Sequence, residues 1–120
     1  MDFFVCHDPK QHLELLLLAD PYEPMIDRYL PQSIVLTAME KGKTVGLIAY
    51  CPVAGGAWEI KNLAVEEAWQ GRGVGRALVQ QVNIYNEAHG TEYAAIELGD
   101  KDSWLGELLY TVIVNRIDPY

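Results

Sequence analysis

Apolar residues recur with helical spacing between residues 74 and 88, and this is the clearest periodicity in the chain. Such spacing places them on one face of a helix, which is then expected to pack against a core. Gly90 follows at a position suited to end the helix. The pattern therefore predicts a helix over 74–88. The apolar residues on its predicted face are Ala77, Leu78, Val82, Tyr85 and Ala88.

Two shorter helices are predicted near the N-terminus. Residues 10–19 show helical spacing of leucines, and residues 25–30 form a second apolar stretch. Pro24 suits the first turn of that second helix, and Pro31 is expected to end it. The leucines that share a face in the first helix are Leu13, Leu16 and Leu17.

Segments rich in Ile, Val and Leu predict the strands. Residues 33–39 and 44–50 flank a short Lys-Gly-Lys turn and are typical of a hairpin. Residues 3–6 are expected to form a short opening strand. Residues 58–65 and 93–98 read as two further strands, one on each side of the long helix.

The order of these elements predicts the fold class. A strand, a loop, a helix and a strand follow one another between residues 58 and 98, and such a crossover is right-handed and joins parallel strands. Together with the hairpin, this predicts an α/β or α+β fold with a mixed sheet. The chain has no internal repeat and no linker, so residues 1–120 are expected to form a single domain.

Composition and charge exclude several classes of partner. Apolar residues make up 50% of the chain, which at this length is enough to bury a core without disulfides or metals. Lys and Arg total 9 against 17 Asp and Glu, a formal charge of -8, so nucleic acid is not an expected partner. The acidic balance favours a cationic or polyamine-like small molecule over a carboxylated one, although a solvated surface that keeps the protein soluble explains the charge more simply.

The sequence shows no targeting, membrane or metal-binding signal. The longest apolar run, residues 15–19, is too short to span a bilayer, and the N-terminus lacks the basic residues of a secretory signal. We therefore expect a cytoplasmic protein with no membrane partner. Cys6 and Cys51 form no CxxC pair and the histidines are scattered, so no metal is expected.

A glycine-rich turn between the strand at 58–65 and the long helix carries the strongest chemical signal. Gly71, Gly73 and Gly75 alternate there, so the side chains that would keep a ligand off the backbone are missing. The first N–H groups of a helix have no partner within it, and the helix dipole adds positive charge. Such a turn can bind a diphosphate, with Arg72 or Arg76 nearby. A purely structural tight turn is the alternative.

Two common nucleotide motifs fit this turn poorly. A P-loop needs Gly-Lys followed by Ser or Thr, but Gly75 is followed by Arg76 and Ala77. A dinucleotide fingerprint needs GxGxxG, but the third glycine position is Arg76 when the pattern starts at Gly71. Neither motif therefore explains the turn.

Residues 70–77 resemble the Q/R-x-x-G-x-G/A acyl-CoA loop of the GNAT superfamily of N-acetyltransferases. Gln70, Gly73 and Gly75 occupy its three signature positions, and residues 58–65 are similar to the strand before that loop. The resemblance implies a mixed, mostly antiparallel sheet flanked by helices. It also implies a central pair of parallel strands that splay apart around the CoA site.

Acetyl-CoA is the cosubstrate that the resemblance implies, and no metal is required. Backbone groups of the strand would pair with the pantetheine arm, and N–H groups of the loop would hold the diphosphate. Asp102 stands where relatives often carry an asparagine that hydrogen-bonds the pantetheine. An ionised aspartate keeps the acceptor of that bond but loses the amide donor. The implied CoA-binding residues are Leu63, Ala64, Val65, Gln70, Gly71, Arg72, Gly73, Val74, Gly75, Arg76, Ala77 and Asp102.

The resemblance implies direct attack by a primary amine on the thioester, without a covalent enzyme intermediate. Glu59, eleven residues before Gln70, stands where several family members carry the general base. An ion pair with Lys61 on the same face is the alternative role. A bulge near Asn62, common in the family, would change which side chains face the cleft. Tyr110 matches the tyrosine that protonates the thiolate, with a packing role as its alternative.

Family domains usually continue with two more strands, whereas this chain ends ten residues after Tyr110. We therefore expect the C-terminal strands to be missing or incomplete. Residues 111–114 are β-branched and favour a lone strand. Either a homodimer partner covers that strand, or the chain is a shortened form of a longer ancestor.

The predicted function is acetyl-CoA-dependent N-acetylation of a small-molecule amine. The first alternative is a CoA-binding or regulatory module of the same fold with little or no transferase activity. The second is a structural, oligomerising protein with a vestigial pocket.

Overall fold

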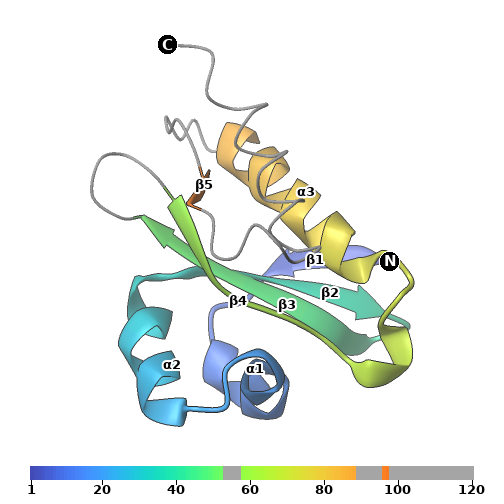
Figure 1. Cartoon of the computed structure of the whole chain (residues 1–120). Helices are drawn as coiled ribbons and strands as arrows, with labels where there is room; N and C mark the ends of the chain where they lie inside the picture. Colours follow the sequence, from blue (N-terminus) through green and yellow to red (C-terminus); the bar gives the residue numbers. More distant parts are fainter. Residues whose placement is uncertain (53–57, 89–95, 98–120) are drawn as a thin grey trace.

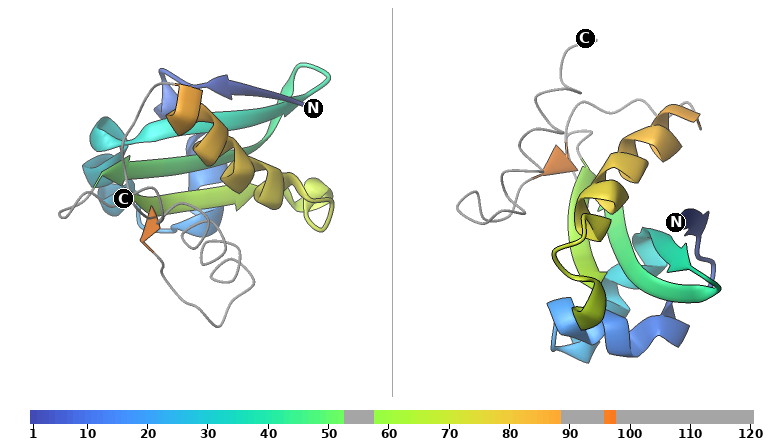
Figure 2. Two further views of the ribbon diagram at one scale, coloured as in Figure 1. Left: turned by 90° about the horizontal axis from the view of Figure 1, so that it is seen from above. Right: turned by 90° about the vertical axis from the view of Figure 1, so that its right-hand side faces the viewer.

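The computed structural model describes residues 1–52, 58–88 and 96–97 of the chain. Its helices and strands are β1 (Asp2–Val5), α1 (Leu13–Ala19), α2 (Glu23–Tyr29), β2 (Ile34–Glu40), β3 (Lys43–Pro52), β4 (Trp58–Val65), α3 (Val74–Ala88) and β5 (Ile96–Glu97). The strands form one sheet in the order β1-β2-β3-β4-β5. Figure 1 shows α3 on one face of this sheet and α1 with α2 on the other, and Figure 2 shows the same layers from two further directions.

The sheet is mixed and mostly antiparallel, as the sequence predicts. The first three strand pairs are antiparallel, and β4 pairs with β5 in parallel through Trp58 and Glu59. The hairpin of β2 and β3 turns at Lys41 and Gly42, whose φ angles are 52° and 78°. Most of the strand predicted at 93–98 lies outside the described residues, so the splayed parallel pair stays a prediction.

Each face of the sheet carries its own core. Helix α3 buries Leu78 and Val82 against Leu36, Ile48 and Tyr50 of the sheet. On the opposite face, α1 and α2 cover a second cluster. Its fully buried members are Leu16, Ile26, Leu47 and Ala49, with Ala64 at 3% exposure. Strand β4 thus lies between two packed layers. Packing on both faces holds this strand in place, and the candidate site is built along it.

All three predicted helices are present, but the bounds of the first two differ from the prediction: α2, predicted over 25–30, spans Glu23–Tyr29. Helix α3 has the bounds predicted for it, whereas the helix predicted over 10–19 begins only at Leu13. Pro9–His12 form a 3₁₀ turn instead, and His12 leaves the helical region with φ −103° and ψ 33°. Within the described ranges, no helix has the length and apolarity needed to cross a membrane.

Gly46 on β3 allows the start of α3 to approach the sheet closely. A Cβ at this position would lie 3.0 Å from Cγ1 of Val74 and 3.2 Å from the carbonyl oxygen of Ala64. Val74 is the first residue of α3 and is 1% exposed. The small residue therefore lets the helix start sit against β3 and β4, and the glycine loop is anchored there.

Candidate acyl-CoA site

Among the described residues, the outer edge of strand β4 is paired only at its beginning. Strand β5 pairs with Trp58 and Glu59, and no other described residue pairs with this edge. On the inner side, Ala49 of β3 faces Asn62 and Tyr50 faces Ile60, so Lys61 has no partner on β3. A bulge near Asn62 is a feature of the family that the sequence resembles, and the pairing of β4 with β3 shows one at this place. The extra residue changes the direction in which side chains before the bulge point relative to side chains after the bulge.

Hydrogen bonding on the inner side of β4 settles which backbone groups face the outer edge. Antiparallel neighbours alternate between pairs that exchange hydrogen bonds and pairs whose N–H and C=O point outward. The N–H of Glu66 donates to the Val45 carbonyl at 2.8 Å, so the register makes Ala64 the next inward-pointing residue. The N–H and C=O of Leu63 and Val65 therefore point to the outer edge, whereas those of Ala64 point to β3, which corrects the predicted backbone contact of Ala64 with pantetheine.

The glycine loop adopts a backbone that favours glycine at two positions. Gly71 has φ 78° and Gly73 has φ 85°, and the residue between them has a negative φ. Alternation of this kind turns successive N–H groups toward one side and makes a concave anion site. Both glycines are exposed, and a Cβ on either would meet no atom within 4 Å. The loop is therefore open to a ligand.

The start of α3 decides which N–H groups are available to that ligand. The N–H of Ala77 donates to the carbonyl of Gly73 at 3.0 Å, which is the first hydrogen bond of the helix. Ala77 is therefore removed from the residues predicted to bind the diphosphate, because its N–H already donates a hydrogen bond within the helix. Val74, Gly75 and Arg76 precede that bond, so their N–H groups have no intrahelical acceptor.

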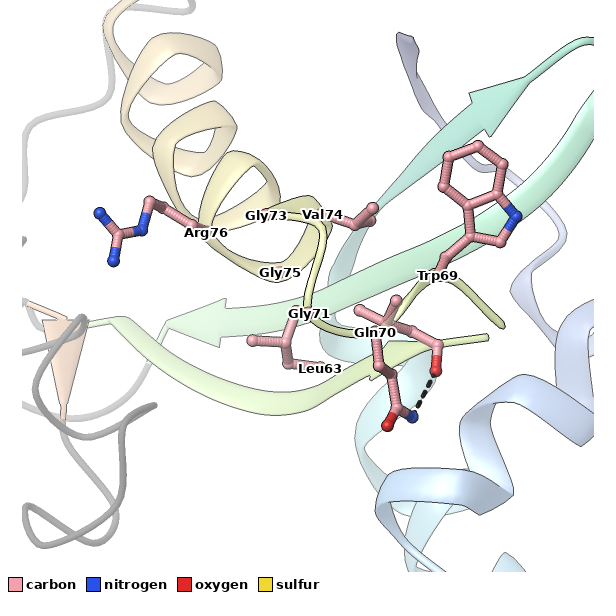
Figure 3. Close-up of a pocket in the computed structure, with 9 residues that line it drawn as sticks. Leu63, Trp69, Gln70, Gly71, Gly73, Val74, Gly75 and Arg76 are labelled. Atoms are coloured by element: carbon pink, nitrogen blue, oxygen red, sulfur yellow. Dashed lines mark hydrogen bonds between the residues drawn. The ribbon is translucent and has the colours of Figure 1, made fainter. Parts of the chain in front are cut away.

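A pocket of about 640 Å³ lies over the loop and the outer edge of β4. In Figure 3, Trp69 and Arg76 stand at opposite ends of this pocket. Arg76 is the one charged residue among its described lining residues, so the pocket suits an anion although the whole chain carries -8. The lining residues are Leu63, Val65, Trp69, Gln70, Gly71, Gly73, Val74, Gly75 and Arg76.

Two loop side chains make contacts within the protein. Gln70 donates from Nε2 to the Val65 carbonyl at 3.0 Å, the dashed bond in Figure 3, and so ties the loop to the end of β4. The guanidinium of Arg72 lies 5.1 Å from the centroid of the Trp69 ring, a cation–π contact. Between the two predicted cations, Arg76 therefore lines the pocket, whereas Arg72 braces the loop.

Glu59 lies in a second pocket, of about 490 Å³, between α2 and the first half of β4. Its carboxylate forms an ion pair with Lys61, which is the alternative role given to it in the sequence analysis. The side chain of Glu59 is 36% exposed, so the carboxylate is also open to the pocket. Glu59 thus lies on β4 before the bulge. The β4 residues that line the loop pocket come after the bulge.

A buried polar network holds the N-terminal helices against the bulge in β4. Asn62, 2% exposed, donates from Nδ2 to the Leu16 carbonyl and to the Tyr29 hydroxyl, both at 3.0 Å. The Tyr29 hydroxyl donates in turn to Oδ2 of Asp20 at 3.4 Å. Burial raises the pKa of Tyr29, so its phenol remains protonated and can keep donating.

We expect Asn62→Ala to lower the free energy of unfolding by about 1–2 kcal/mol. The change removes both donors of Asn62, but it also removes Oδ1, which has no hydrogen-bond partner among the described residues and offsets part of the loss. Urea unfolding measures the effect. Asn62→Asp is expected to cost more, because it also buries a charge. An unchanged midpoint for both variants would show that the network contributes nothing to stability.

The structure leaves two predicted residues unassessed and adds others. Tyr110 and Asp102 lie outside the described residues. No sequence pattern predicts Asp20, Arg28 and Tyr29, which line the second pocket together with Glu59. No motif marks them, because they lie in α2 or just after α1 and meet β4 only through the tertiary fold. Asn62 did carry a signal, because the alternation of a regular strand would place it on one face with the apolar residues Ile60 and Ala64.

Comparison with known proteins identifies the family. The profile of the acetyltransferase (GNAT) domain family matches residues 31–111. A curated relative from Bacillus subtilis (strain 168), the uncharacterized N-acetyltransferase YvbK, is 32% identical over 95 residues. That match covers 79% of this chain and 60% of the relative, so the chain spans less than two thirds of the relative's length.

Solved structures agree with this match. An IAA acetyltransferase from Bacillus cereus ATCC 14579 superposes with a TM-score of 0.77 and 28% identity, over 92% of this chain and 73% of that one. A GNAT family acetyltransferase from Elizabethkingia anophelis, solved with acetyl-CoA bound, gives a TM-score of 0.76 and 29% identity, over 92% and 72%. Because the family profile spans β2 to β5 and the whole glycine loop, the chain belongs to the GNAT acetyltransferase family.

Proposed function

We propose that the protein transfers an acetyl group from acetyl-CoA to the primary amine of a small molecule. The observation that carries this proposal is the loop pocket, where N–H groups without an intrahelical acceptor, together with Arg76, adjoin the outward-pointing backbone of Leu63 and Val65. The diphosphate of acetyl-CoA matches the N–H groups and Arg76. Its extended, amide-containing pantetheine arm matches the backbone of Leu63 and Val65. The residues present therefore fit the family's cosubstrate.

The proposed chemistry is a direct displacement at the thioester. Bound acetyl-CoA supplies the acetyl group, and the C–S bond breaks as the new C–N bond forms. The N–H of Leu63 or Val65 polarises the thioester carbonyl. Glu59 accepts the proton that leaves the amine, directly or through a water molecule, and Tyr110 donates a proton to the departing thiolate. No covalent enzyme intermediate forms.

Turnover is tested by release of the CoA thiol with acetyl-CoA and a panel of primary amines. The proposal expects amine-dependent thiol release and an N-acetylated product of the amine. CoA binding without turnover on any amine would instead favour a CoA-binding or regulatory module. The Glu59–Lys61 ion pair is the feature that favours this second candidate, because it gives the carboxylate a structural role. Localisation in the cytoplasm and a homodimer over the C-terminal strand stay predictions.

Tyr110→Phe is expected to reduce kcat by about tenfold to a hundredfold, with the CoA dissociation constant unchanged. The loss is smaller than for a general base, because a thiol of pKa about 8.5 is a good leaving group even without an acid. Steady-state kinetics and calorimetry measure the two quantities. Equal rates for the variant and the parent would remove Tyr110 from the mechanism.

A further inference from the structure

The second pocket carries charges of both signs beside the proposed base. We propose that this pocket binds the acceptor as an amine that also carries a carboxylate, and that Arg28 holds the carboxylate. The inference rests on the proposed function, since it takes the occupant of the pocket to be the acceptor. It extends that function by naming a substrate class and a residue that recognises it.

The balance of charge around this pocket differs from that of the whole protein. Its charged lining residues are Asp20, Glu59, Arg28 and Lys61, two acidic and two basic, whereas the chain as a whole carries -8. A site for a polycation would need an excess of carboxylates. A pocket with both signs instead matches a ligand with both signs. The local charges thus argue against the carboxylate-free amine that the overall composition favours.

Arg28 is the cation of this pocket that remains available. Lys61 is already paired with Glu59. The acidic residues of α2, Glu23 and Asp27, are both paired with Lys10, and no ion pair of Arg28 is observed within the described part of the chain. Arg28 is exposed in the last turn of α2, where its guanidinium can bind a carboxylate through two parallel hydrogen bonds.

Asp20 is the matching anion for the ammonium form of the acceptor. Its Oδ1 accepts the N–H of Tyr22 at 3.2 Å, and its Oδ2 accepts the Tyr29 hydroxyl at 3.4 Å. These bonds hold the carboxylate in place without neutralising it. An amine that enters between Asp20 and Glu59 is therefore attracted before it loses its proton. Ile60 and Met25 provide apolar lining for the body of the ligand.

The test compares amino acids with their decarboxylated counterparts as acceptors. L-phenylalanine is paired with 2-phenylethylamine, and β-alanine with ethylamine, at saturating acetyl-CoA. We expect Arg28→Gln to lower kcat/KM for the carboxylated member of each pair by about tenfold to a hundredfold, and to leave the other member unchanged. Arg28→Lys should retain part of the preference. Lys43→Gln removes one charge from the exposed start of β3 and serves as the matched control.

The outcomes separate this inference from the proposed function. Equal losses on both members of a pair, or a parent enzyme that prefers the decarboxylated members, would overturn the role of Arg28. Calorimetric titration of L-phenylalanine and β-alanine into the CoA-bound protein needs no turnover. If an amino acid binds the parent but not Arg28→Gln and nothing is acetylated, the pocket assignment stands and the transferase proposal falls. If neither amino acid binds the parent at millimolar concentration, the assignment is wrong.

Discussion

Gly73→Asp is expected to raise the dissociation constant of CoA at least about a hundredfold. The residue sits at the helix start with φ 85° and is exposed, immediately before the three N–H groups proposed to hold the diphosphate. A carboxylate about 4 Å from a phosphate oxygen costs about 4 kcal/mol at an effective dielectric constant of about 20. It also opposes the positive end of the dipole of α3. Calorimetric titration with CoA measures the change.

The β2–β3 turn offers a matched control for this substitution. Gly42 has φ 78°, and a Cβ there meets no atom within 4 Å, as at Gly73. Gly42→Asp therefore adds the same side chain and a similar backbone strain of about 1–2 kcal/mol, at a residue that does not line the loop pocket. It should leave CoA affinity unchanged. Gly73→Ala adds the strain without the charge and should give an intermediate loss. A Gly73→Asp variant with the parent's affinity would refute the loop assignment.

Glu59→Gln is expected to reduce kcat by about a hundredfold to ten-thousandfold, while CoA binds as before. The amide keeps the size of the side chain but cannot accept the proton of the attacking amine. CoA affinity should hold because Glu59 lines the second pocket and not the loop pocket. Thiol release under saturating acetyl-CoA and amine measures the rate.

Lys61→Met distinguishes the two roles of Glu59. It breaks the same ion pair but leaves the carboxylate in the pocket. If Glu59 is the base, Lys61→Met should retain turnover within a few-fold of the parent and Glu59→Gln should not. If the carboxylate serves only the ion pair, the two variants should lose the same amount of activity and of stability. Urea unfolding of both variants completes the comparison.

The sequence predicted the elements that carry the loop because their signals are local. The bounds of β4 and α3 agree with the structure, since an apolar strand, a polar turn with alternating glycines and a helical repeat follow one another within thirty residues or so. The positive φ of Gly71 and Gly73 agrees with the same reasoning, because glycine adopts that conformation without a steric penalty. Local chemistry therefore located the candidate CoA site.

Features that depend on register and tertiary packing could not be predicted in this way. The bulge at Lys61 arises from the pairing of β4 with β3, and a one-residue shift in pairing leaves no mark in the sequence of either strand. Asn62 is buried only because α1 and α2 cover it. The second pocket brings Arg28 of α2 beside Glu59 of β4, residues that are far apart in the chain.

Binding of the CoA diphosphate by backbone N–H groups at the start of α3 is the central claim, and amide NMR tests it most directly. CoA and pantetheine, which lacks the diphosphate, are titrated separately into ¹⁵N-labelled protein. The account predicts that CoA produces the largest shifts at Gly73, Val74, Gly75 and Arg76, and that pantetheine shifts Leu63 and Val65 while leaving the loop amides in place. Loop amides that respond equally to both compounds, or to neither, would contradict it.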